Sequence, residues 1–239
     1  MKTTLKRLAL NHVPPGPMGT IKRWHYLRSL KHYDIASEPD LCGCQLLLCK
    51  GDNVIDVGAN IGVYTRFCSD FIGSTGQVIA LEPVPETFSY LQSNTRALGL
   101  RNVQCLNVAA SDHDCDTECM RVPTLPTGGP NLYGATLCPD GNVSVKARKL
   151  DSLIPTLTPA LIKCDVEGHE AACIAGAREL IRRCRPKFLM EVTDPGLFTL
   201  FDSLGYKPFY FDQGQLRPRD PEIRRMNFFF IPQENAFLH

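Results

Sequence analysis

The sequence of 239 residues lacks several features that would narrow its function at once. No apolar run approaches the roughly 20 residues that a helix needs to cross a membrane. The net charge is only +1, from 26 basic and 25 acidic residues, so the charge balance gives no reason to expect a nucleic acid or an anionic membrane as partner. The N-terminal segment MKTTLKRLALNHVPPG has too short an apolar patch for a signal peptide. We therefore expect a cytoplasmic protein with no membrane span.

Motifs of two common enzyme classes are also absent. The stretch DVGANIG is G-x-x-x-G and differs from the G-x-G-x-x-G of dinucleotide-binding enzymes. The stretch HEAAC differs from the HExxH of zinc peptidases. These absences argue against a nicotinamide-dependent oxidoreductase and against a metallopeptidase.

Cysteine, in contrast, is abundant, with eleven residues. An odd number leaves at least one thiol unpaired in any all-disulfide scheme, and several cysteines lie within apolar runs, where a thiol packs as a small hydrophobic group. The sequence contains no CxxC pair, the spacing that would indicate a zinc site. The weaker candidates are Cys42 with Cys44, and the set His113, Cys115, Cys119 and Cys138. We expect reduced thiols and no metal site.

Short apolar runs rich in β-branched residues alternate with helical patterns from residue 51 onward, which is typical of an α/β fold with a parallel sheet. Helices are expected at 61–71, around 88–98, from residue 169 and at 196–204. The expected strands lie at 53–57, 77–81, 102–108, 160–165, 187–192, 206–211 and 226–231. We predict a helical appendage over 1–40 and one domain over 41–239.

The predicted domain carries an irregular insertion at 111–150. It contains the turn-forming clusters PTLPTGGP and CPDGN, flanked by strand-like stretches at 118–122 and 143–148. A long irregular segment in a compact domain is usually functional. The roles of this insertion and of the appendage stay open at this point.

The glycine turn after the first predicted strand indicates a ligand site. Glycines between a strand and a helix let the backbone approach a ligand closely, and ligands of open α/β sheets bind outside the carboxyl ends of the strands. Glu82 ends the second predicted strand, where a carboxylate can accept hydrogen bonds from two ribose hydroxyls. Asp56 can pair with an ammonium group. Together these features favour S-adenosylmethionine, a nucleoside with a cationic amino-acid tail, over a plain solvated turn.

The stretch IKCDVEGHE, residues 162–170, places five ionisable residues between apolar segments. Strand alternation puts Ile162 and Cys164 on one face and Lys163 and Asp165 on the other. Asp165 then lies at the carboxyl end of a strand, in the same crevice as Asp56 and Glu82. Because unpaired charges are costly to bury, a cleft or a paired network is expected here.

This charged stretch offers groups for proton transfer. His169 can act as a base near neutral pH, while Asp165 or Glu167 orients it or faces a sulfonium. An alternative has Asp165 and Glu167 binding a divalent cation, but we favour the version without metal. A purely structural interpretation has Glu170 capping a helix and Lys163 pairing with Glu167.

The sequence resembles the FkbM-type methyltransferases. The segments that carry the resemblance are EPDL, GDNVIDVGANIGVYT, VIALEPVPETFSYL, KLDSL, LIKCDVEGHEAACIAGA and LMEV, within residues 38–192. The resemblance implies a Rossmann-like class I sheet, mostly parallel with an antiparallel strand near the C-terminus and helices on both faces. It also implies O-methylation of a small hydroxylated acceptor such as a saccharide.

The resemblance assigns residues to two groups. The cofactor would be held by Asp56, Gly58, Ala59, Asn60, Gly62 and Glu82, with Asn107 near the adenine. The reaction centre would be lined by Asp165, Glu167 and His169. The sequence departs from the family pattern in its cysteine content and its insertion, which leaves the acceptor open.

Two alternative functions remain open besides O-methylation. One is a non-catalytic nucleoside-binding module, although Asp165, Glu167 and His169 are all present, and the other is the nicotinamide-dependent oxidoreductase. Nucleic acid is not expected as an acceptor. The sequence has neither the Asn/Asp-Pro-Pro-aromatic loop of amino methylation nor the Pro-Cys of cytosine methylation.

Overall fold

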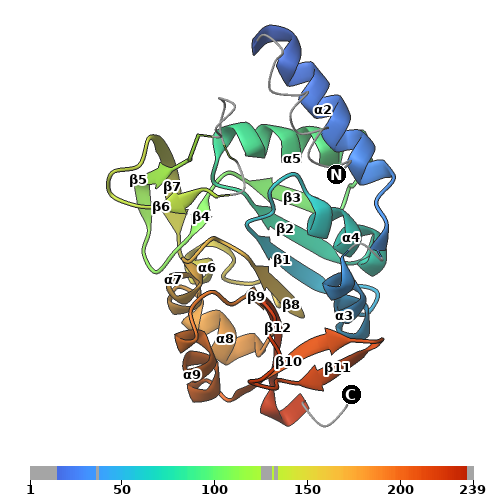
Figure 1. Cartoon of the computed structure of the whole chain (residues 1–239), viewed down its shortest axis with the longest axis vertical. Helices are drawn as coiled ribbons and strands as arrows, with labels where there is room; N and C mark the ends of the chain where they lie inside the picture. Colours follow the sequence, from blue (N-terminus) through green and yellow to red (C-terminus); the bar gives the residue numbers. More distant parts are fainter. Residues whose placement is uncertain (1–14, 36–37, 125–130, 132–133, 236–239) are drawn as a thin grey trace.

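The apolar runs pair into one large sheet in the computed structural model, which describes residues 15–35, 38–124, 131 and 134–235 (Figure 1). The strand order is β11-β10-β12-β9-β8-β1-β2-β3. The strands are β1 (Asn53–Val57), β2 (Gln77–Leu81), β3 (Val103–Leu106), β8 (Leu161–Cys164), β9 (Lys187–Glu191), β10 (Tyr206–Asp212), β11 (Gln215–Pro218) and β12 (Asn227–Pro232). The neighbouring strands β9, β8, β1, β2 and β3 are parallel to one another. Strand β12 pairs antiparallel with β9, β10 with β12, and β11 with β10.

Helices cover both faces of this sheet because successive side chains of a strand point to opposite sides. Val54 and Leu161 pack on the face that carries α3 (Pro39–Leu47), α4 (Val63–Ile72) and α5 (Pro85–Ala97). Ile55 and Ile162 pack on the opposite face. That face is covered by α6 (Leu150–Leu153), α7 (Glu170–Ala175), α8 (Arg178–Cys184) and α9 (Gly196–Ser203). The predicted α/β sheet, its antiparallel C-terminal part and its two helical layers are confirmed.

The predicted insertion contributes three strands to a second, smaller sheet of order β4-β7-β5-β6, and β4 lies just before the insertion. Its strands are β4 (Ala109–Ala110), β5 (Cys115–Arg121), β6 (Thr136–Leu137) and β7 (Val143–Arg148). The segment is therefore more regular than its turn-forming composition predicts. The two strand-like stretches fall in β5 and β7, while most of the cluster PTLPTGGP lies outside the described residues.

Helix α2 (Pro15–Lys31) packs against α5 and runs obliquely to it (Figure 1). The rings of Tyr26 and Tyr90 meet edge to face with centroids 5.2 Å apart, and Lys22 pairs with Glu86 at 3.6 Å. The first fourteen residues of the predicted appendage lie outside the described residues. The expected division at residue 40 falls inside α3, whose Leu41 is fully buried; the division itself stays a prediction. Among the described residues, no helix is both long and apolar enough to span a membrane.

Candidate active site

A cavity of about 300 Å³ opens at the carboxyl ends of β1, β2, β8 and β9. Ligands of open α/β sheets bind at this edge. Of the residues predicted to bind a cofactor, Gly58, Ala59, Asn60 and Glu82 line the cavity. All three residues predicted for the reaction centre, Asp165, Glu167 and His169, also line it.

The turn after β1 brings the backbone against the loop after β8. Gly58 has a φ of +73°, and a Cβ atom on it would lie 2.0 Å from the carbonyl oxygen of Asp165. The Gly58 and Ala59 amides donate to the carbonyl of Leu81, at 3.0 and 2.9 Å. Gly58 is therefore needed for the close approach of two protein segments. The amides of Gly58 and Ala59 already donate hydrogen bonds within the fold.

Replacing Gly58 with alanine is expected to destabilise the fold more than the same change at Gly99. Both glycines have a positive φ, +73° and +69°, but a Cβ atom on Gly99 would meet no other segment of the described chain within 4 Å. The backbone strain of about 1–3 kcal/mol is common to both variants, whereas the overlap at Gly58 adds about 1–3 kcal/mol more. Urea unfolding of the two variants measures the difference, and equal losses would contradict this explanation.

Glu82 is held by the backbone on both sides of its carboxylate. One oxygen accepts from the Asn60 amide at 3.0 Å and the other from the Val84 amide at 2.9 Å. Burial raises the pKa of Glu82 to about 7, although these two hydrogen bonds oppose the shift. The carboxylate keeps free lone pairs, since an ionised carboxylate offers about four acceptor positions.

Asp56 lies beneath the cavity rather than in its wall. Its side chain is fully buried, accepts a hydrogen bond from the Thr65 hydroxyl at 2.5 Å and lies 3.6 Å from the Lys163 ammonium. The geometry does not support the expected contact between Asp56 and an ammonium group of a cofactor. The cation that pairs with Asp56 is supplied by the protein itself.

Lys163 joins the turn after β1 to the loop after β8. Its Nζ donates to the carbonyl of Gly58 at 2.9 Å and lies 3.5 Å from Asp165. Burial alone would lower the pKa of Lys163, but the charges of Asp56 and Asp165 outweigh burial and raise it. The suggested pairing of Lys163 with Glu167 is wrong, since the ammonium pairs with Asp56 and Asp165.

Three carboxylates meet at one side of the cavity. Asp165, Glu167 and Glu191 each bring an oxygen within 4.8 Å of the others. Burial, with the charge of Asp165 as the next cause, raises the pKa of Glu191 to about 7. Carboxylate oxygens are the ligands of hard divalent cations, although exposed acidic groups are common without one. Within the described residues this is the one group of three or more His, Cys, Asp or Glu side chains with such spacing, and the eleven cysteines are free thiols.

His169 is half-buried in the cavity wall. Its Nε2 lies 3.0 Å from the hydroxyl oxygen of Ser111. Burial lowers the pKa of His169, and the charges of Asp112 and Glu170 oppose this only in part. The imidazole is therefore neutral near physiological pH and able to accept a proton.

Glu170 is the first residue of α7 and follows the loop that carries the three predicted catalytic residues. Its carboxylate accepts hydrogen bonds from the amides of Val166 and Gly168, at 3.1 and 3.2 Å. The structural role suggested for Glu170 therefore fits the geometry, with the side chain binding amides just before the helix.

Two further residues predicted to bind the cofactor do not line the cavity. Gly62 has a φ of +101° and precedes α4. The Asn107 amide donates to the carbonyl oxygens of Glu82 and Pro83, at 2.8 and 2.9 Å. Asn107 thus shapes the loop after β2 and does not itself face the cavity.

Several lining residues were not predicted from the sequence. Glu191 is the third residue of the segment LMEV and the last residue of β9, a position that strand order alone could have indicated. Tyr64, Met120, Leu137 and Asn227 come from α4, from the small sheet and from β12. No local motif marks these four residues, because their approach to the cavity depends on how distant segments pack.

Comparison with solved structures defines the class of protein. The methyltransferase FkbM structure from Methylobacillus flagellatus KT superposes with a TM-score of 0.52 at 18% identity, covering 77% of this chain and 44% of that one. This likeness shows a class I methyltransferase fold, as the sheet topology indicates. Residues 56–224 match the methyltransferase FkbM domain. The chain belongs to the FkbM methyltransferase family, and the predicted resemblance is confirmed.

Two curated relatives share parts of this sequence. Hexuronic acid methyltransferase AglP of Haloferax volcanii is 30% identical over 148 residues, which cover 60% of this chain and 57% of the relative. Protein-L-isoaspartate O-methyltransferase 2 of Archaeoglobus fulgidus is 34% identical over 64 residues, 26% of this chain and 29% of the relative. The chain thus spans a little over half of the first relative and less than a third of the second.

Proposed function

We propose that this protein transfers a methyl group from S-adenosylmethionine to a hydroxyl of a small acceptor, with a saccharide as the favoured class. The observation that carries the proposal is the shared cavity: Glu82 faces it from β2, and Asp165, Glu167 and His169 face it from the loop after β8. Membership of the FkbM family supports methyl transfer. The similarity to a hexuronic acid methyltransferase supports a sugar.

The residues of the cavity suit such a reaction. Glu82 would accept hydrogen bonds from the ribose hydroxyls, and the turn at Gly58–Asn60 would lie against the cofactor. When bound, S-adenosylmethionine supplies a methyl group whose bond to sulfur breaks as the acceptor oxygen attacks, which leaves a neutral thioether. His169 accepts the hydroxyl proton of the acceptor, because an alcohol is too weakly acidic to react unaided. Asp165 and Glu167 would lie on the sulfonium side of the bound cofactor.

A second version of the mechanism uses a divalent cation to lower the pKa of the acceptor. The spacing of the Asp165, Glu167 and Glu191 oxygens, all within 4.8 Å, is the observation that favours it. We rank it second because His169 provides a base without metal. If the version without metal holds, dialysis against a chelator leaves the rate unchanged. Loss of the rate, restored by Mg²⁺, would favour the cation.

Two measurements test the proposed function. Isothermal titration with S-adenosylmethionine and with NAD separates a methyltransferase from an oxidoreductase, and we expect binding of the first alone. Transfer of labelled methyl to a panel of neutral, carboxylated and amino sugars separates an enzyme from a non-catalytic binding module. An oligonucleotide is a useful further member of the panel, and we expect no transfer to it.

Replacing Glu82 with glutamine is expected to weaken S-adenosylmethionine binding and to remove its pH dependence. In the wild type, ribose hydroxyls would favour the ionised carboxylate, so binding lowers the raised pKa of about 7 and releases a proton. Affinity therefore increases as the pH rises between about 6 and about 8. Titrations at several pH values measure this slope. Glu86→Gln, on the outer part of α5, is the control, and an unchanged slope in Glu82→Gln would show that the ribose assignment is wrong.

A further inference from the structure

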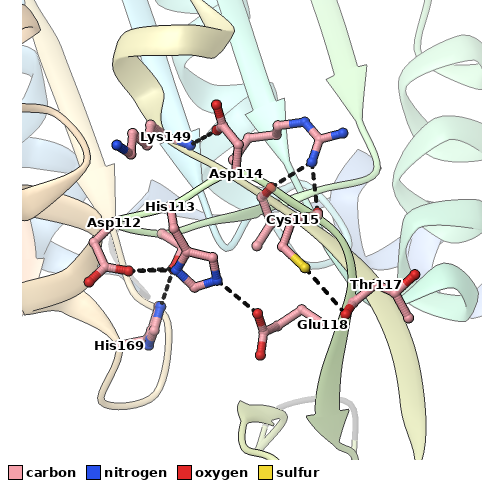
Figure 2. A network of polar contacts seen from close by, with 11 residues as sticks. Asp112, His113, Asp114, Cys115, Thr117, Glu118, Lys149 and His169 are labelled. Carbon is pink, nitrogen blue, oxygen red and sulfur yellow. Dashed lines mark hydrogen bonds and ion pairs between the residues drawn. The ribbon is translucent and has the colours of Figure 1, made fainter.

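Polar contacts connect His169, which lines the cavity, with the exposed side chains of Asp112 and His113. Figure 2 shows this network. His169 Nε2 lies 3.0 Å from Ser111 Oγ, and Ser111 Oγ lies 3.3 Å from Asp112 Oδ1. Asp112 Oδ1 lies 2.7 Å from Nδ1 of His113, and Nε2 of His113 lies 2.8 Å from Glu118. The contacts connect the loop after β8 with the start of the small sheet.

Ser111 is fixed at the centre of this network. Its side chain is fully buried, and its amide donates to the Arg148 carbonyl at 2.9 Å. A Cβ atom on Gly176 would lie 1.9 Å from the Ser111 carbonyl oxygen, so the end of α7 presses directly on this backbone. The Cys173 thiol also donates to the preceding carbonyl, that of Ala110, at 3.1 Å. The hydroxyl therefore has a defined position relative to the helix that follows His169.

The direction of each hydrogen bond in this network follows from the contacts of His113, at the surface. Both ring nitrogens of His113 face carboxylate oxygens, which only accept, so both nitrogens carry a proton. The hydrogen bonds to Asp112 and Glu118, and then the charges of these two carboxylates, raise the pKa of His113 and favour this form. Asp112 accepts the hydroxyl proton of Ser111 at 3.3 Å. Ser111 Oγ also lies 3.4 Å from the protonated Nδ1 of His113, and in this longer contact the hydroxyl oxygen can only accept. Because that hydroxyl has only one proton, its oxygen accepts from Nε2–H of His169.

We propose that Ser111 is a positioning residue that holds His169 in the tautomer with its proton on Nε2. This leaves Nδ1 as the nitrogen that accepts a proton in the cavity. The inference rests on the proposed function only for the use made of Nδ1, because the tautomer exists without substrate. Asp112, His113 and Glu118 set the direction of the hydrogen bonds, and Glu170 is the remaining charged group that acts on His169.

The tautomer can be read directly by long-range ¹H–¹⁵N NMR on the full-length protein labelled with ¹⁵N-histidine. Spectra are recorded without cofactor or acceptor, at a pH where His169 is neutral. The chain has six histidines, and His169→Asn assigns the signals of interest. We expect an unprotonated Nδ1 and a protonated Nε2 at His169. A protonated Nδ1 in the wild type would overturn the proposal.

Two variants test how the hydrogen-bonded network sets the tautomer of His169. Ser111→Ala removes the acceptor of Nε2–H, and we expect the Nδ1–H tautomer to appear. Asp112→Ala, at an exposed position, frees the Ser111 hydroxyl to rotate and donate to Nε2, so the same shift is expected in a protein whose core is intact. Asp114→Ala is the control, because Asp114 binds Lys149 and Ser152 instead of Ser111. An unchanged tautomer in Asp112→Ala would overturn the directional argument even if Ser111→Ala fails to fold.

The test of the His169 tautomer and the test of the proposed function can fail independently of each other. If labelled methyl is never transferred but the tautomer shifts as expected, the positioning role of Ser111 stands and the methyltransferase proposal fails. If methyl is transferred but the tautomer is the opposite one, the proposed function stands and the role of Ser111 falls.

Discussion

Replacing His169 with alanine is expected to lower the rate of methyl transfer by about 10²- to 10⁴-fold, the range that general base catalysis contributes. Affinity for S-adenosylmethionine should stay nearly unchanged, because His169 is hydrogen-bonded to Ser111 and makes no hydrogen bond to Glu82, whose carboxylate is held by the amides of Asn60 and Val84. The two quantities are measured by labelled methyl transfer, to whichever sugar of the panel accepts it, and by isothermal titration. A fully active variant would remove His169 from the mechanism.

The pH profile gives an independent check on this prediction. Burial lowers the pKa of His169. At saturating S-adenosylmethionine the wild-type profile should therefore contain a step in which the rate falls as the pH drops through that lowered value and the imidazole becomes protonated. In His169→Ala this step disappears. The acids of the cavity titrate in both proteins, so the difference between the two profiles isolates His169. His32→Ala, which changes an exposed histidine after α2, is the matched control and should keep the wild-type profile.

The sequence predicted seven of the eight strands of the large sheet, because each of these seven is a local pattern; the short edge strand β11 was not predicted. Val54 to Val57 and Leu161 to Cys164 are apolar or alternating runs between turn signals, and the pairing of β1 with both β2 and β8 follows from the α/β alternation. The small sheet was harder to predict. Its pairs join segments separated by turn-forming residues, and β4 and β6 are only two residues long, too short for any periodicity to show.

The candidate site was predictable where a residue follows a strand directly or lies in the turn after it. Glu82 and Asp165 follow β2 and β8 directly, and the structure places both in the cavity wall. The pairing of Asp56 with Lys163 could not be predicted in this way, because strand alternation specifies the face of the sheet on which a side chain lies but not the side chain next to it. Lys163 lies on the adjacent strand, where Asp56 pairs with it in the register of β1 and β8. Ser111 is brought to His169 by the close approach of Gly176, which no spacing in the sequence encodes.

Replacing Lys163 with methionine is expected to destabilise the fold by about 3–5 kcal/mol, the cost of leaving one partner of a buried ion pair uncompensated. Asp56 is fully buried, and within the described residues one of its carboxylate oxygens has no hydrogen-bond partner, so Lys163 is its main compensation. The variant also loses the link to the Gly58 carbonyl. Chemical denaturation measures the change in the free energy of unfolding.

The matched control is Lys207→Met, which removes a lysine from an exposed ion pair. Lys207 lies 2.8 Å from Asp202, with 47% and 65% of the two side chains exposed. Water screens this pair, so the loss should stay within about 1 kcal/mol. Comparable losses in the two variants would contradict the importance assigned to burial.

A double variant separates the charge of Lys163 from its hydrogen bonds. In Asp56→Asn with Lys163→Met, neither charge is left alone in the core, so part of the stability lost in Lys163→Met should return. The bonds from Nζ to the carbonyls of Val57 and Gly58 are absent in both proteins. If the double variant is as unstable as the single one, these bonds and not the charge of Asp56 account for the loss. If stability returns, the buried aspartate next to the glycine turn is tolerated only because β8 supplies its cation.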